Sequence, residues 1–152
     1  MTVVHIQKAK RALRVVCNSE MILDARFALG CCPVGHKQCE GDGRTPEGEY
    51  FVCTRNERSK YHLALGLSYP NASDARRGLQ AGLIDGQTFA GIVQRLEAGL
   101  RPPWDTPLGG FIMIHGGGIE SDWTAGCIAL PNEHMDALWA LCPLGTRVVI
   151  EA

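Results

Sequence analysis

The chain has 152 residues, of which 45% are hydrophobic and 20% are charged, and its formal net charge is −1. This length predicts a single domain, residues 1–152, which buries roughly two-thirds of its unfolded surface. The balanced charge, without a lysine- or arginine-rich block, argues against a nucleic-acid partner. No apolar run approaches the length of a membrane span, which is about 18 residues. We expect the protein to be a monomer.

The first residues, Met1 to Lys8, reach charged side chains without the apolar segment of a signal peptide, so the sequence predicts no leader and leaves the localisation open. The chain contains seven cysteines. An odd number outside an oxidising compartment indicates free thiols more than a disulfide framework.

Apolar or alternating runs rich in β-forming residues recur along the chain, with Gly- and Pro-rich turns between most of them. They predict a mostly β domain with strands at residues 13–17, 21–29, 50–54, 62–67, 111–115, 128–130 and 147–151.

Two helices are predicted, with a weaker signal for a helical turn at 74–79. The first follows Asp85, a helix-capping residue type, and ends at Gly99; its apolar positions follow helical spacing. The second begins at Asn132 and ends at Pro143. The region 71–107 separates two groups of strands and contains the first helix. We interpret it as a helical insertion, either a lid over the active-site face or a plain surface element.

One histidine and one cysteine stand at the ends of two apolar runs. His115 follows Ile112 to Ile114 and precedes a glycine turn, whereas Cys127 follows Gly126 and precedes another apolar run. A thiol becomes a nucleophile when an imidazole takes its proton, and backbone N–H groups beside it can stabilise the oxyanion that forms. The alternative is that Cys127 is a small buried hydrophobe and His115 a hydrogen-bonded core histidine.

These residues resemble the signature of the L,D-transpeptidase catalytic domains of the YkuD type. That signature is a histidine followed later by Ser/Thr-His-Gly-Cys, and the matching positions are His115, Thr124, Gly126 and Cys127. The segment 41–50 resembles the Thr-Pro-x-Gly-x-Tyr/Phe hairpin of the family. With 108–110 and the helix start at Asn132, the similarity covers nearly the whole chain.

The chain departs from the family pattern at three points. Ala125 stands where the family has a second histidine, and Ala129 stands where an arginine is often found. The histidine and cysteine are also closer together than in the best-known members. These features resemble a small subgroup of murein-trimming and transpeptidase-like proteins with a Trp-Thr-x-Gly-Cys-Ile-Ala motif. They affect the choice of acceptor more than the nucleophile.

The resemblance implies an L,D-transpeptidase-type β-sandwich or barrel with two or three helices packed at the periphery. It also implies acyl transfer on peptidoglycan stem peptides through a thioester on Cys127, without a cofactor. His115 is the expected base, oriented by the carbonyl of Gly116, and the N–H groups of Gly126 and Cys127 are the expected oxyanion hole. An L,D-carboxypeptidase, a murein-trimming amide hydrolase and an inactive peptidoglycan-binding module remain alternatives.

Three residues are candidates for substrate binding: Trp123, Thr124 and Tyr69. Trp123 lies close enough to the nucleophile to line its pocket, although a single tryptophan equally often fills core space. Asp122 is either a group that attracts a substrate ammonium or a solvated loop residue.

The segment with Cys31, Cys32, His36 and Cys39 contains residue types that bind zinc. Its spacing fits no recognised zinc motif, so we predict no metal, and a zinc-stabilised or redox-sensing protein is the alternative interpretation. The other histidines are rivals to His115 as the base, and His62 is the best of them.

Overall fold

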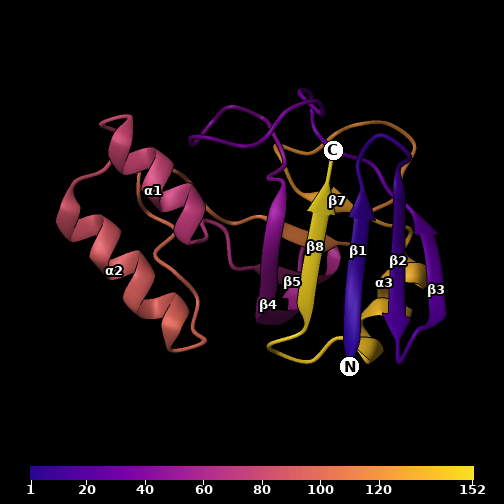
Figure 1. Cartoon of the computed structure of the whole chain (residues 1–152). Coiled ribbons are helices and arrows are strands. Elements are labelled where there is room, and N and C mark those ends of the chain that lie inside the picture. The colour runs from indigo at the N-terminus through magenta and orange to yellow at the C-terminus, as the bar shows by residue number, and fades with distance from the viewer.

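The computed structural model describes residues 1–152 as eight strands and three helices (Figure 1). The strands are β1 (Thr2–Gln7), β2 (Ala12–Cys17), β3 (Glu20–Arg26), β4 (Gly48–Ser59), β5 (His62–Leu67), β6 (Met113–His115), β7 (Ile128–Ala129) and β8 (Arg147–Glu151). The helices are α1 (Ala72–Gln80), α2 (Gly86–Glu97) and α3 (Asn132–Leu141). The fold is mostly β, as predicted. No helix has the length and apolar composition to cross a membrane.

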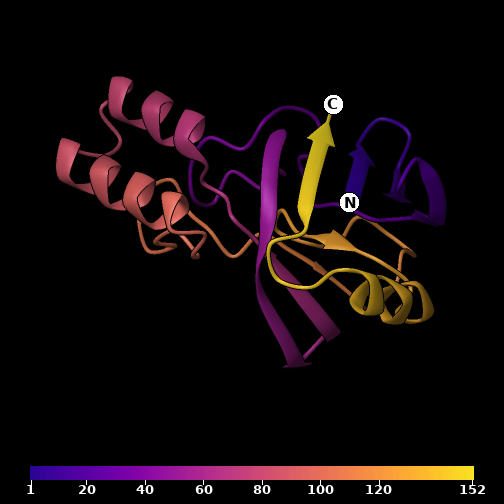
Figure 2. The ribbon, with the colours of Figure 1, turned by 60° about the horizontal axis from the view of Figure 1, so that its bottom comes forward.

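All eight strands form one curled sheet in the order β3-β2-β1-β8-β4-β5-β6-β7. The long strand β4 makes the bend, because its first residues pair with β8 and its later residues pair with β5. Its pairing with β5 shifts register between Val52 and Thr54, and such bulges increase the local twist. In Figure 2, β5 therefore turns away from the layer that contains β8 and β1.

The core lies inside this curl and is built from alternate residues of the strands. Val4 and Ile6 of β1 are fully or almost fully buried, whereas His5 between them is exposed. A cluster of 21 buried residues continues through the other strands to Met135 and Leu138 of α3. The alternation in β1 is the signal for a strand that the sequence prediction, which began at residue 13, did not include.

The two free ends of the sheet meet through the segment after β3. Ala28 exchanges two backbone hydrogen bonds with Ala129 of β7, with N–O distances of 2.9 and 3.0 Å, and Gly30 forms a bridge with Thr124. The predicted strand 21–29 thus ends at Arg26, and its last residues run on to these bridges. This contact fixes the segment that leads to Cys127.

α1 and α2 form a pair beside β4, with a small core of its own made by Ala75, Ile84, Ile92 and Leu108. The predicted helix after Asp85 is confirmed as α2, and the Asp85 side chain accepts the Thr88 N–H. The helical turn expected at 74–79 is the nine-residue α1, which begins in a capping box between Asn71 and Asp74. In both ribbon views the helix pair lies apart from β7 (Figures 1 and 2).

Candidate active site

His115 ends β6, and Cys127 directly precedes β7, the strand beside it. The parallel pairing of the two strands places Ile114 beside Ile128 and His115 beside Ala129. Ile114 and Ile128 point into the core. Because side chains alternate along a strand, His115 points to the opposite face from Ile114. The Cys127 sulfur contacts the N–H of Met113, two residues before His115.

The His115 ring is held from one side by the backbone. Its Nδ1 lies 2.6 Å from the carbonyl oxygen of Gly116, and only 4% of the residue is exposed. A carbonyl can only accept, so Nδ1 carries the proton and Nε2 keeps the lone pair. Ala64 and Ala129, its neighbours on β5 and β7, are small and leave space for the ring.

Two aromatic side chains cover the His115 ring. Tyr61 stacks on it with ring centroids 4.7 Å apart and an interplanar angle of 25°. Trp123 meets it edge to face at 5.4 Å and also touches Tyr61 at 4.9 Å. Burial lowers the pKa of His115 below its ordinary 6.5, and the hydrogen bond to Gly116 opposes this only in part. His115 is therefore neutral at pH 7 and able to accept a proton.

The Cys127 thiol is held between two backbone groups of the segment before β6. It donates to the carbonyl oxygen of Phe111 at 3.2 Å and accepts the N–H of Met113 at 3.4 Å. Burial raises the pKa of this thiol above its ordinary 9.0, against the opposing effect of the Met113 N–H. The resting thiol is thus protonated and is hydrogen-bonded to Phe111 instead of His115. A rotation of the Cys127 side chain is needed to bring its proton to the imidazole.

The loop before the nucleophile is fixed by its own side chains. The Thr124 hydroxyl donates to the carbonyl of Cys127 at 2.7 Å and accepts the N–H of Gly126 at 3.2 Å. One of the two N–H groups expected in the oxyanion hole, that of Gly126, is therefore engaged. The N–H of Cys127 has no acceptor within the chain. Thr124 shapes the loop, and its hydroxyl is occupied within it.

Gly126 lies against the segment 41–50, which resembles the family hairpin. Its carbonyl accepts the Thr45 hydroxyl at 2.7 Å. Its φ is +132°, and a Cβ at this position would lie 2.7 Å from the carbonyl oxygen of Arg44. No side chain fits there without moving the loop, so this glycine allows the close approach of two backbones.

The two aromatic candidates for substrate binding differ in position. Trp123 is half-buried, donates its indole N–H to the Gly118 carbonyl at 3.0 Å, and lines a pocket of about 330 Å³ with Tyr61. Tyr69, in contrast, is fully buried in the core and donates its hydroxyl to the carbonyl of Leu108 at 2.8 Å. Tyr69 borders a different pocket, of about 230 Å³, together with Lys37 and residues of α1, so its role in substrate binding stays a prediction.

The rival histidines have other partners or lie elsewhere. His62 Nε2 lies 2.6 Å from Asp136 on α3, and His36 contacts the Glu47 N–H through Nδ1 and Asp74 through Nε2, both at 2.7 Å. His5 is exposed on β1 and His134 lies on α3. Since both ring nitrogens of His36 are occupied, the segment 31–39 does not assemble a zinc site, and no group of three potential metal ligands occurs in the structure.

Sequence reasoning missed two residues of this site, Tyr61 and Phe111. Tyr61 follows β4 and stacks on a ring 54 positions later, so no local pattern marks it. Phe111 has a left-handed backbone, with φ of 56°, and the residue is 60% exposed. The only local sign was the Gly109-Gly110 pair before it.

Comparisons with known proteins agree with this architecture. The model of a family described as YkuD, the L,D-transpeptidase catalytic domain, matches residues 1–150. YafK of Escherichia coli (strain K12), which carries a provisional L,D-transpeptidase name, is 28% identical over 109 residues, or 70% of this chain and 31% of that protein.

Solved structures share the fold. Pgp2, a helical cell shape determining protein from Campylobacter jejuni, matches with a TM-score of 0.70 and 23% identity over 99% of this chain and 47% of its own. Bd1075 of Bdellovibrio bacteriovorus matches with a TM-score of 0.63 and 22% identity over 98% of this chain and 47% of its own. L,D-transpeptidase 1 of Mycobacterium tuberculosis matches at 0.56 and 10% identity over 99% of this chain and 61% of its own. The chain spans about half the length of Pgp2 and Bd1075 and about a third of YafK.

Proposed function

Because this chain belongs to the YkuD family of L,D-transpeptidase catalytic domains, we propose that it transfers acyl groups between peptidoglycan stem peptides through a thioester on Cys127. The observation that supports the proposal is the contact of the Cys127 sulfur with Met113, two residues before His115 on β6. The Gly116 carbonyl fixes the tautomer that leaves Nε2 of His115 as a base. Pgp2 is named for helical cell shape, and we extend to this chain a role in shaping the cell wall.

The reaction begins when the Cys127 thiol turns from the Phe111 carbonyl and gives its proton to Nε2 of His115. The sulfur attacks the carbonyl carbon of the third residue of the donor stem. The N–H of Cys127 donates to the oxyanion that forms, and such a donor is worth about 10²–10³ in rate. The imidazolium then protonates the departing amine, the terminal D-alanine leaves, and a thioester remains on Cys127.

The second half-reaction runs through the same two groups. An amine of a second stem, such as the side chain of meso-diaminopimelate, loses a proton to His115 and attacks the thioester, which forms a cross-link and restores the thiol. Water in place of the amine gives an L,D-carboxypeptidase. No step requires a metal or a cofactor, since the Cys127 sulfur forms the bond to the acyl group and the His115 imidazole transfers the proton.

The proposal is tested by digesting purified muropeptides with the protein and identifying the products by mass. Dimers together with released alanine support transfer, whereas released alanine without dimers identifies the hydrolytic alternative. Cleavage of existing bridges identifies the murein-trimming alternative. Binding of stem peptides without any product identifies the inactive peptidoglycan-binding module and overturns the proposal.

A carbapenem provides a second readout, because the family resemblance implies that it acylates Cys127. The wild-type protein should gain the mass of one carbapenem, and Cys127→Ala should gain none while keeping its melting temperature. Cys39→Ala is the matched control, since this thiol lies on a different loop and should leave the adduct unchanged. An adduct of equal yield on wild type and Cys127→Ala contradicts the assignment of the nucleophile.

A further inference from the structure

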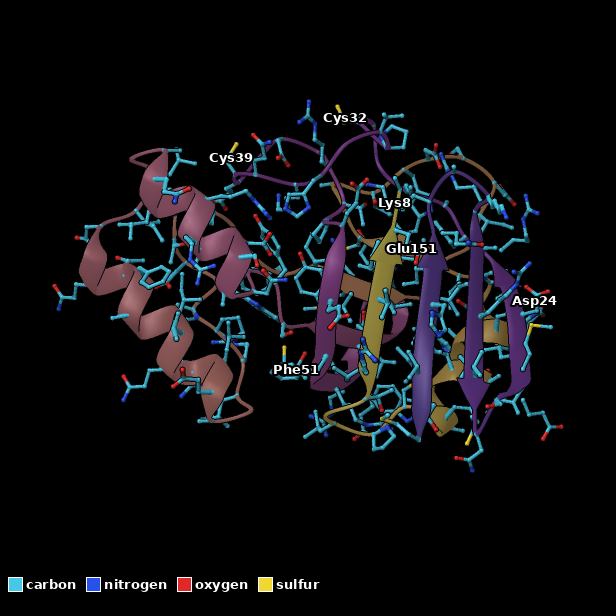
Figure 3. The ribbon with its side chains drawn as sticks, viewed as in Figure 1. Lys8, Asp24, Cys32, Cys39, Phe51 and Glu151 are labelled. Carbon is cyan, nitrogen blue, oxygen red and sulfur yellow. The ribbon has the colours of Figure 1, made fainter.

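Cys31 and Cys32 are adjacent, exposed thiols that face each other. Their Sγ atoms lie 3.7 Å apart in a hydrogen bond. Both residues are exposed, and neither forms a disulfide. Figure 3 shows Cys32 at the outer edge of the loops above the sheet, apart from Cys39 on the same stretch of chain.

Packing does not account for this pair. Free cysteine is among the residue types most often buried, where it behaves as a small hydrophobe. Cys142 follows that rule: it is buried, and burial raises the pKa of its thiol to about 11. Cys53 is half-buried, and burial raises its pKa to about 12. These two thiols are protected, whereas Cys31 and Cys32 meet solvent together.

Gly43 lies against the sulfur atoms of Cys31 and Cys32. A Cβ on Gly43 would lie 2.7 Å from the Sγ of Cys31 and 3.5 Å from that of Cys32, and the φ of Gly43 is +69°. A side chain at this position would crowd the Cys31 sulfur, whereas 3.5 Å is an ordinary contact distance for the Cys32 sulfur. Gly43 therefore leaves room for the Cys31 thiol beside Cys32.

We propose that Cys31 and Cys32 form a vicinal dithiol site that undergoes thiol–disulfide exchange with low-molecular-weight disulfides. One of the two cysteines, as its thiolate, attacks one sulfur of the disulfide, forms a mixed disulfide, and releases one small thiol. The sulfur of the other cysteine, after losing its proton to solvent, displaces the second small thiol and closes the Cys31–Cys32 bond. The protein loses two electrons and two protons, and the small disulfide gains them as two thiols.

The hydrogen bond between the two sulfurs raises the pKa of the Cys32 thiol, and the nearby Arg44 guanidinium opposes the rise only in part. Either sulfur can be the donor of that bond, so either cysteine can begin the exchange.

The site is coupled to Cys127 through Gly30. Gly30 forms a bridge with Thr124, and a Cβ on Gly30 would lie 3.1 Å from the N of Gly126. Consecutive Cα atoms stay about 3.8 Å apart, outside the about 4.4–6.8 Å of ordinary disulfides. A bond between neighbouring cysteines is therefore strained, and closing it changes the torsions of Cys31 and Cys32. We expect this change to reach the loop before the nucleophile through Gly30. We expect acylation of Cys127 to slow in the oxidised form.

The first experiment needs no activity. Cys127→Ala protein is treated with oxidised glutathione, its remaining thiols are blocked with iodoacetamide, and the protein is cleaved by trypsin. The peptide 27–37 contains Cys31 and Cys32 and no other cysteine. We expect it unblocked and about 2 Da lighter than the reduced form. A peptide with two blocked thiols, or with two separate glutathione adducts, overturns the proposal.

Matched variants test whether Cys32 is the partner of Cys31 in the disulfide bond. In Cys32→Ser, the peptide should carry one glutathione and no internal bond, because no sulfur remains to displace it. Cys39→Ser should close the Cys31–Cys32 bond as wild type does. If Cys39→Ser prevents the bond, the site involves a different pair from the one proposed.

The effect on Cys127 rests on the proposed function and is measured separately, as the rate of carbapenem capture. After oxidation the wild-type rate should fall about fivefold or more and recover with dithiothreitol. The double variant Cys31→Ser/Cys32→Ser reports any direct oxidation of Cys127. Equal losses in both proteins overturn the coupling. If reduced wild type captures nothing, the proposed function fails, whereas the mass of peptide 27–37 still decides the dithiol site.

Discussion

Arg11 and Asp122 form a two-armed ion pair that ties the turn between β1 and β2 to the loop before the nucleophile. Arg11 Nη2 lies 2.7 Å from Asp122 Oδ2, and Nη1 contacts Oδ1. Oδ1 also accepts the N–H of the buried Leu29 at 2.9 Å. The sequence left open a role for Asp122 in attracting a substrate ammonium. In the structure its carboxylate binds Arg11 and the N–H of Leu29.

This arrangement predicts unequal costs for removing the two partners. Arg11→Ala should lower the free energy of unfolding by less than about 1 kcal/mol, because the pair is partly exposed. Asp122→Ala should cost about 1–3 kcal/mol, since it leaves the buried N–H of Leu29 without an acceptor. Urea unfolding measures both values. Equal costs would show that the contact with Leu29 contributes nothing.

The pH dependence of stability should have the same origin. The hydrogen bond from Arg11 lowers the pKa of Asp122 from 3.8 to about 2. A lowered folded-state pKa stabilises the fold above the unfolded-state pKa, and that stabilisation is lost as the pH falls toward 2. In Arg11→Ala the folded-state pKa moves back toward 3.8, so the loss should be smaller and should be complete at a higher pH, which acid titration followed by circular dichroism detects.

The rate of Cys127 acylation should depend on pH in opposite ways with and without His115. In wild type the base is a neutral imidazole whose pKa lies below 6.5, so the rate should level off above about pH 7.5 and fall in acidic solution. In His115→Ala only the spontaneously formed thiolate reacts. Because the thiol pKa lies above 9.0, that rate should rise about tenfold per pH unit through pH 9.

Intact-mass kinetics with a carbapenem provide the measurement. Cys39→Ala is the control, since it should reproduce the wild-type profile. A wild-type rate that climbs steadily from pH 6.5 to 9 would mean that His115 does not act as the base.

Most strands and the long helices could be predicted because their signals are local. The apolar positions after Asp85 repeat with helical spacing, and this helix is confirmed as α2. β1 was missed even though the buried Val4 and Ile6 flank the exposed His5, because its pairing with β8 is a contact across almost the whole chain. The alternation of two residues is too short a pattern to predict a strand by itself.

In the candidate site, too, the residues in local motifs could be predicted and the contacts that depend on the fold could not. His115 and Cys127 stand in local motifs, so the sequence identified them. The Thr124 hydroxyl accepts the N–H of Gly126, a group expected in the oxyanion hole. This hydrogen bond could not be predicted, because it depends on the conformation of the loop. The same holds for the stacking of Tyr61 on His115, which depends on the register between β5 and β6.

Tyr61 should control the protonation of His115. Tyr61→Ala exposes the ring to water and weakens the desolvation that lowers its pKa, so the pKa of His115 should move up toward 6.5. Tyr61→Phe keeps the stacked ring and should leave the pKa where it is. Titration of the imidazole by NMR measures the change. A rise of equal size in both variants would assign the effect to the hydroxyl instead of the ring.

Phe111 combines two roles that a pair of variants can separate. Its carbonyl accepts the Cys127 thiol, whereas its ring packs on Trp104 with centroids 4.7 Å apart and the residue is 60% exposed. Its left-handed φ of 56° costs free energy that glycine does not incur. Phe111→Gly should therefore be more stable than Phe111→Ala by about 1 kcal/mol, as measured by urea unfolding.

Reactivity should separate the ring from the carbonyl. Both variants lose the exposed aromatic ring of the residue whose carbonyl accepts the Cys127 thiol, so stem-peptide turnover should show a KM raised about threefold to tenfold in each. Phe111→Gly also frees the backbone that positions the thiol, so only this variant should acylate more slowly with a carbapenem. If Phe111→Ala keeps the wild-type KM, the exposed ring does not contact the stem, and the strained backbone serves the thiol alone.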